Sequence, residues 1–154
     1  DDPDQAERLL AEATSVLRHA GPWFQSRALL VRALVAVGRG NADDALALMR
    51  DCLTRIRDVQ DKYLFVHALV PLAAAAALKG RDAWAARILG ARDAVTERTG
   101  TMVVIKPVQT LKKRVEQAVR SRLGQDQWAL EYAAGRMTSI DALLEDIEGV
   151  VRPG

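Results

Sequence analysis

Glycines that end alanine-rich helical patterns constrain the fold of this chain most strongly. Gly40 and Gly80 stand 40 residues apart, and the same pattern surrounds each of them. An alanine precedes each glycine by seven residues, and an alanine and a large apolar residue follow at five and nine: Ala33, Ala45 and Met49; Ala73, Ala85 and Leu89. Small side chains let antiparallel helices approach closely, and glycine permits the tight turn between them. The pattern predicts two successive helical hairpins, over about residues 22–60 and 61–100.

Apolar residues recur at spacings of three and four along most of the chain, which predicts an all-α fold. Hydrophobic residues make up 49% of the sequence but aromatic residues only 5%, so alanine and aliphatic side chains must form the core. Asn41 or Asp43 can cap the third helix, and Ser139 the last one. We expect one domain, residues 1–154, with about eight helices over about residues 4–20, 22–38, 41–59, 62–80, 81–99, 107–124, 126–136 and 139–151.

Two segments depart from this helical pattern. Pro71 lies inside the fourth expected helix, where it removes a backbone donor. We expect a kink at Pro71 or, alternatively, two short helices that meet there. The β-branched residues of TMVVIK, residues 101–106, favour an extended segment. We therefore expect an apolar linker between the second hairpin and the C-terminal helices, 107–150, and we expect its valines and isoleucine to plug a groove.

The arrangement around the two glycines resembles the tetratricopeptide repeat, with a small residue on the first helix and alanine and a large apolar residue on the second. The resemblance implies a right-handed stack of antiparallel hairpins in which the first helix of each hairpin lines a concave surface. An earlier half-unit is indicated by a third occurrence of the spacing, in which Ala6, Leu10 and Ala13 match Ala45, Met49 and Cys52. The alternative is an alanine-rich bundle in which glycines only end the helices.

Residues 80–148 carry a more specific order of motifs. These are AARILGA at Ala85–Ala91, the pair Leu123-Gly124, Trp128, the triplet Ala134-Gly135-Arg136, Ser139 and Ala142. This order resembles the helical C-terminal region of large bacterial ATP-binding, LuxR-type regulators similar to the activator of the maltose regulon. Many relatives continue into a DNA-binding helix-turn-helix, and others carry an N-terminal Ser/Thr kinase. The resemblance implies a tetratricopeptide-like arm that senses an effector or partner and controls an ATPase or kinase module.

The function predicted from these patterns is that of a sensory or protein-interaction domain in a bacterial signalling or transcriptional regulator. Its partner would be a protein, another part of the parent chain or a small-molecule effector, bound in a helical groove. Because the sequence opens DDPDQAERLL without methionine, we expect a piece of a longer protein. The alternatives are a nucleic-acid-binding helical domain and a structural dimerisation module that uses apolar residues of TMVVIK or GVV.

Two polar residues are candidates for lining the groove. Arg27 and His67 stand 40 residues apart, at equivalent positions on the first helices of the two hairpins. Both are therefore predicted to project into the concave surface. Arg27 could bind a carboxylate of a partner through its forked guanidinium, and His67 could respond to pH or donate a hydrogen bond. The alternative is that both are ordinary polar residues near helix ends.

The sequence contains no motif that indicates catalysis, a metal or a cofactor. His19 and His67, the two histidines, have no carboxylate or cysteine at ligand spacing, so we expect no metal site. The GRGN turn at residues 38–41 lacks the Lys-Ser/Thr of a phosphate-binding loop. Cys52 lies on an apolar stripe and is expected to be a small core residue. We predict no enzymatic activity for this chain.

Charge and hydropathy limit the partners that we expect. The formal net charge of +2 is too near neutral to indicate nucleic acid. The basic segment 106–122 nevertheless offers Lys112, Lys113 and Arg120 for phosphate contacts, or for contact with an acidic surface of the parent protein. No apolar run reaches the roughly 18 residues that a membrane span requires. With one cysteine and no signal peptide, we expect a cytoplasmic protein that contacts no membrane and that can form oligomers.

Overall fold

The computed structural model describes residues 5, 8, 9, 12, 21–59, 61–101, 105–139, 141–143, 145 and 146. Within these ranges the regular structure is helical and contains no strand, which confirms the predicted all-α class. The helices are α2 (Pro22–Gly38), α3 (Ala42–Val59), α4 (Lys62–Leu78), α5 (Asp82–Thr99), α6 (Lys106–Leu123) and α7 (Gln125–Met137). Most of the first and last expected helices, and linker residues 102–104, lie outside the described residues.

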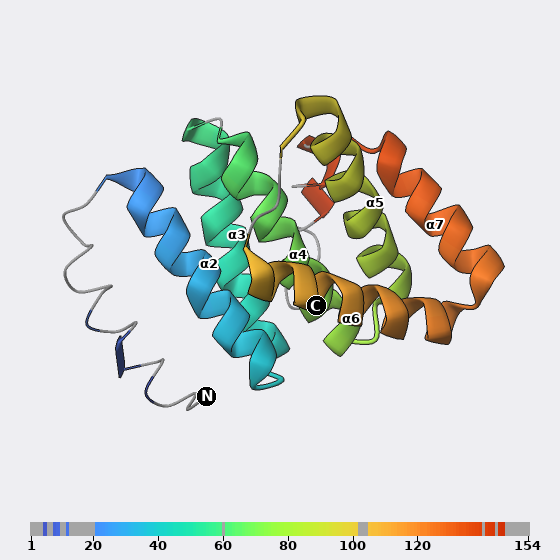
Figure 1. Cartoon of the computed structure of the whole chain (residues 1–154), viewed down its shortest axis with the longest axis horizontal. Helices are drawn as coiled ribbons and strands as arrows, with labels where there is room; N and C mark the ends of the chain where they lie inside the picture. Colours follow the sequence, from blue (N-terminus) through green and yellow to red (C-terminus); the bar gives the residue numbers. More distant parts are fainter. Residues whose placement is uncertain are drawn as a thin grey trace.

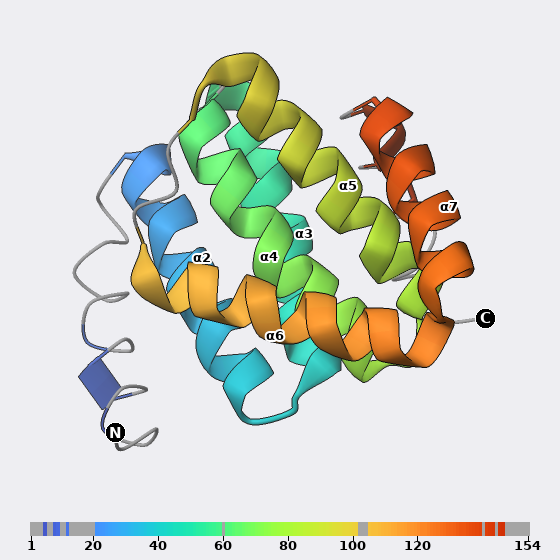
Figure 2. The same cartoon turned by 45° about the vertical axis from the view of Figure 1, so that its right-hand side comes forward.

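Helices α2 to α5 follow one another in space as they do in sequence (Figure 1). Each packs against the next, and α4 also contacts α2, so α4 lies at the centre of the molecule. Helix α6 then crosses over α4 and α5 (Figure 2), and α7 lies along the outer side of α5. The chain therefore places α6 across α4 and α5, which precede it in the sequence.

The turns at Gly40 and Gly80 have the same construction. The backbone φ angle is +75° at Gly40 and +71° at Gly80, in the left-handed region that favours glycine. In both turns the amide after the glycine donates to the carbonyl five residues back, at 2.9 Å. All six residues of the predicted pattern are fully buried: Ala33, Ala45, Met49, Ala73, Ala85 and Leu89. The two hairpins therefore share their turn geometry and their contact positions.

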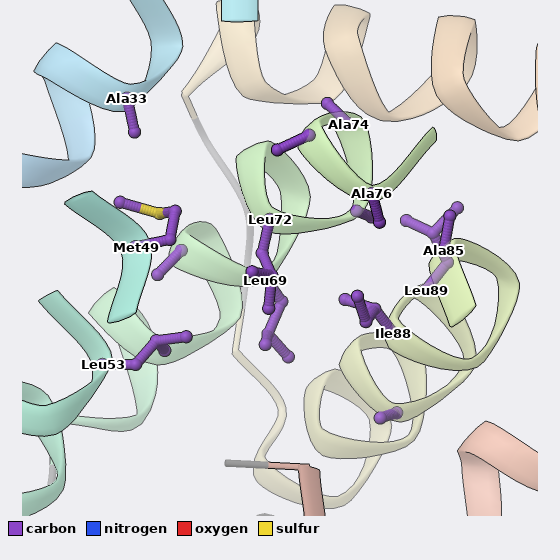
Figure 3. Close-up of a cluster of buried hydrophobic side chains, with 14 of the residues drawn as sticks. Ala33, Met49, Leu53, Leu69, Leu72, Ala74, Ala76, Ala85, Ile88 and Leu89 are labelled. Carbon is purple, nitrogen blue, oxygen red and sulfur yellow. The ribbon is translucent and has the colours of Figure 1, made fainter. Parts of the chain in front are cut away.

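The core lies on both sides of α4 (Figure 3). Met49 and Leu53 of α3 face α4 from one side, and Ile88 of α5 faces it from the other. Leu69 and Leu72 of α4 lie between them and are fully buried, which is why an almost uninterrupted apolar sequence suits this helix.

Helix α4 continues through Pro71, so the expectation of two short helices is wrong. Proline lacks the amide hydrogen that would bond to the carbonyl of His67. Pro71 is itself buried, and contacts with α2, α3, α5 and α6 hold the helix together around it. Tertiary packing therefore outweighs the lost hydrogen bond.

Side-chain caps begin several of the helices. The Asn41 carboxamide oxygen accepts from the amide of Asp44 at 3.2 Å, which confirms one of the two predicted caps for α3. The Ser139 hydroxyl likewise accepts from the amide of Ala142 at 3.1 Å, as predicted. Asp61, where the fourth helix was expected to begin, accepts from the amide of Leu64 at 3.0 Å.

Two glycines bring α5 and α7 into close backbone contact. A Cβ atom at Gly135 would lie 2.0 Å from the carbonyl oxygen of Arg87, and one at Gly90 would lie 2.1 Å from that of Tyr132. Real Cβ atoms do not approach other atoms that closely, so only glycine fits either position. The motifs AARILGA and Ala134-Gly135-Arg136 therefore pack directly against each other.

Candidate binding groove

A groove of about 750 Å³ opens between α2, α4 and α6. Helix α4 packs against both other helices and forms the base of the groove. Leu34 and Val37 contribute from the C-terminal half of α2, and Leu111 and Val115 from α6. A pocket of this size falls within the range that accommodates ligands.

The groove exists because α4 contributes small side chains at its base. Ala74 and Ala77 lie where α4 passes between α2 and α6. Methyl side chains cannot fill the space between two flanking helices, so the space stays open. Leu78, which is 50% exposed, follows at the edge of the groove. The alanine run PLAAAAALKG thus forms both a tightly packed core and the base of an open site.

Ion pairs to α5 hold α6, one wall of the groove, in place. Near its middle, Lys112 contacts the Asp93 carboxylate at 3.0 Å. At its C-terminal end, Arg122 donates two hydrogen bonds to Asp82, at 2.6 and 2.8 Å. Such bidentate pairs fix orientation as well as distance. These contacts with α5 therefore help to fix the position of α6 over α4.

Asp93 also connects α5 to α7, because its carboxylate accepts a hydrogen bond from the Tyr132 hydroxyl at 2.8 Å. Burial raises the pKa of Asp93, but hydrogen bonds from Arg92, Lys112 and Tyr132 and the charge of Lys112 lower it below its usual value. The carboxylate is therefore ionised at neutral pH. A single charged group thus joins α5, α6 and α7.

The α6 wall of the groove is basic. Lys106, Arg114 and Arg122 line it from α6, and none of the described residues that line it is acidic. Lys106 and Arg114 are exposed and form no ion pair with a described residue, whereas Arg122 is held by Asp82. The groove therefore combines an apolar base with two unneutralised cations.

The three basic residues predicted to contact phosphates or an acidic surface have different surroundings in the structure. Lys112 is paired with Asp93 and Glu116, and Arg120 contacts Glu116 and Gln125. Of the three predicted residues, only Lys113 is an exposed cation without an ion pair in the described part of the chain. Lys112, Lys113 and Arg120 thus do not form a patch of three free charges.

The regular spacing of the groove-facing cations is the signal that the sequence offers for them. Lys106, Arg114 and Arg122 follow one another at intervals of eight residues, and residues at positions four apart between them also line the groove. Residues four apart are neighbours on a helix surface, so the lining residues form one continuous row along α6. The spacing does not show what this row faces.

The prediction that His67 projects into an open groove is wrong, because the side chain is fully buried. Its Nδ1 donates to the carbonyl of Tyr63 at 2.7 Å, and its Nε2 has no partner among the described residues. Burial lowers the pKa of His67 despite the backbone hydrogen bond, and the charges of Arg92 and Arg27 lower it further. The ring is therefore neutral at pH 7.

Arg27 lies half-buried on α2, with its guanidinium 4.7 Å from the centre of the Trp23 ring. Its charge is one of the contributions that lower the pKa of His67. Neither residue lines the groove. The groove lies instead near the C-terminal ends of α2 and α4.

Other candidate chemistry is limited in the part of the chain that the structure describes. Cys52 is buried, and its thiol donates to the carbonyl of Ser26 at 3.3 Å, as a core residue would. The described residues hold no cluster of three metal-ligating side chains, and none of their helices is long and apolar enough to span a membrane. A second hollow of about 540 Å³, at the start of α5, has Asp82, Arg87 and Asp146 around it and thus mixed charge.

Comparison of the chain with models of protein families, with curated proteins and with solved structures gave no match. The groove and its charges therefore carry the functional argument.

Proposed function

We propose that this chain is a sensory or protein-interaction arm of a bacterial signalling or transcriptional regulator, cytoplasmic and without catalytic activity of its own. Its helices would form a right-handed, tetratricopeptide-like stack of antiparallel hairpins. The groove between α2, α4 and α6 would bind a partner or effector and so control an attached ATPase or kinase module.

The observation that carries this proposal is the position of the groove. Helices α2 and α4 are the first helices of two hairpins with matching turns, and both contribute residues to it. In tetratricopeptide-like stacks the first helices line the concave surface, where partners bind. The order of motifs in residues 80–148 supports the same type of regulator.

The proposed mechanism is mechanical. A ligand in the groove contacts α6 on one side and α2 and α4 on the other. If it binds one spacing of these helices more tightly than another, it shifts the population towards that spacing. Because Asp82 and Asp93 tie α6 to α5, a shift of α6 also acts on α5 and α7. The attached module would sense that movement.

The proposal is tested by blocking the groove in the longer protein that carries this chain. Ala77→Trp places a large ring at the base of the groove, and Ala47→Trp places the same ring on the exposed surface of α3, which does not line the groove. The assay is ATP turnover or autophosphorylation across the signals to which the parent responds. We expect Ala77→Trp to abolish the response while Ala47→Trp retains it. Equal responses from both variants and the wild type would contradict the proposal.

A second candidate function, a dimerisation module, is favoured by the outer surface of α7. Leu130 is 64% exposed and Met137 is 88% exposed, and Ala133 and Ala134 beside them are exposed as well. Exposed apolar side chains in a row are typical of contact surfaces. Sedimentation at two concentrations, for the wild type and for Leu130→Glu with Met137→Glu, tests this candidate. A monomer at both concentrations in the wild type would contradict it.

A further inference from the structure

We infer that the groove between α2, α4 and α6 binds an acidic amphipathic helix of a protein partner. The inference rests on the proposed function, since it names the ligand class of the same groove. Its experiment uses purified components and is independent of any ATPase or kinase response.

The base of the groove requires an apolar ridge on the ligand. Leu34 and Val37 of α2, Ala77 of α4 and Leu111 of α6 present aliphatic carbon to the opening. Leu78 adds a half-exposed apolar side chain at the edge. Aliphatic side chains at positions three and four apart on a helix form a ridge that fits such a groove, as in other helix-in-groove complexes. A strongly polar ligand would leave the apolar base of the groove in contact with water.

The α6 wall requires negative charge beside that ridge. Lys106 and Arg114 are exposed and unpaired in the described chain, and no described carboxylate lines the groove to compensate them. The first turn of α6 adds to this field, because no side chain caps its N-terminus. Charge complementarity of this kind selects partners and speeds their association. The ligand is therefore anionic as well as apolar.

The spacing of the unpaired cations favours a helix over a small anion. The two unpaired cations of the wall, Lys106 and Arg114, stand eight residues apart on α6, or about 12 Å at the rise of an α-helix. Carboxylates two helical turns apart on a partner helix have nearly the same spacing, of about 11 Å. A small effector contacts only one of these cations at a time.

The test measures binding of synthetic helices to the whole 154-residue chain. The probe is a fluorescein-labelled helical peptide of about 20 residues with a leucine stripe flanked by glutamates two turns apart. Two matched peptides replace the glutamates by lysine or shuffle the stripe. Dodecanoate and a short DNA duplex serve as an amphipathic small anion and a polyanion. Fluorescence anisotropy gives the Kd of the peptides, and competition reports the other two ligands.

Variants of the chain locate the binding site. The double variant Lys106→Glu with Arg114→Glu reverses the charge of the α6 wall. Leu78→Glu places a carboxylate at the edge of the groove without removing a core side chain. Arg50→Glu is the matched control, because Arg50 is exposed on α3, which does not line the groove. We expect the glutamate peptide to bind, with its Kd raised by at least about tenfold in the first two variants and by less than about twofold in the control. Its Kd should also rise with salt.

The remaining outcomes overturn the inference. It fails if the lysine or shuffled peptide binds as tightly as the glutamate peptide, or if the groove variants bind like the control. It also fails if only dodecanoate or only DNA binds at the groove. Dodecanoate binding would leave the proposed sensory function intact, with a small effector in place of a helix. If no probe binds, the response of the parent protein to Ala77→Trp decides separately whether the proposed function stands.

Discussion

Replacement of Gly135 by alanine should destabilise the chain through one methyl group. The new Cβ would lie 2.0 Å from the carbonyl oxygen of Arg87 and 2.6 Å from its Cα, whereas real Cβ atoms essentially never come within 3.0 Å of another atom. These atoms belong to the backbone of α5, so no side chain can rotate away. Helices α5 and α7 must therefore separate by about 1 Å along the contact, at the cost of overpacked or lost contacts.

The size of this effect follows from two opposing contributions. Overpacking of a close contact costs about 1–3 kcal/mol, and a contact with rigid backbone lies at the upper end. Alanine recovers about 1 kcal/mol through its higher helix propensity. We expect the free energy of unfolding to fall by about 2 kcal/mol, which lowers the Tm by about 4–8 °C for a chain of this length.

Thermal and urea denaturation followed by circular dichroism measure this change. Gly38→Ala is the matched control, since a Cβ at Gly38, also helical, meets nothing within 4 Å. We expect that control to keep the wild-type Tm or to exceed it. Gly90→Ala should destabilise the fold to a similar extent as Gly135→Ala. The double variant should lose less stability than the sum of the two single losses, because both methyl groups force apart the same contact between α5 and α7. A Tm for Gly135→Ala at or above that of wild type would refute the close packing of α5 and α7.

Three further predictions concern single side chains. Burial, and secondarily the charge of Asp51, raises the pKa of the Cys52 thiol to about 12. The folded chain should therefore not react with a thiol reagent at pH 8, whereas the chain in denaturant should react fully. Prompt labelling of the folded chain would contradict this prediction. Burial and the hydrogen bond to Asp93 raise the pKa of Tyr132 from 10.0 to about 12. The folded state thus holds this proton more tightly than the unfolded state, and the associated stability, present below pH 10, should be lost between about pH 10 and 12. Chemical denaturation should show a steeper loss for wild type than for Tyr132→Phe, and equal slopes would count against the shift. Asp61→Ala should lower the free energy of unfolding by about 1 kcal/mol, because it removes the cap of α4; an unchanged Tm would show that the cap is dispensable.

The sequence predicted the turns at Gly40 and Gly80 because their determinants are local. A glycine with positive φ, the small residues beside it and the caps at Asn41 and Ser139 act within one or two turns of the chain. The burial of Ala45 and Ala85 follows from the same 40-residue spacing. Features of this kind can be recognised without knowledge of the tertiary structure.

The groove was not predictable in the same way, because its position depends on contacts far apart in the sequence. Arg122 and Asp82 are 40 residues apart, and their ion pair helps to place α6 across α4. The 40-residue spacing predicted equivalent positions for Arg27 and His67 on the first helices of the two hairpins. It did not show that His67 would be enclosed, because enclosure depends on what packs over that position.

The most direct test of the central claim is to map the binding site on the ¹⁵N-labelled chain by NMR, with the glutamate peptide as ligand. Binding in the groove should give saturable shifts of backbone amides in the C-terminal halves of α2 and α4 and along α6, with the amide of Ala77 among the most affected. Amides on the exposed side of α3, around Arg50, should remain unchanged. Saturable shifts confined to α3 or to the outer surface of α7 would contradict the claim that this groove is the binding site.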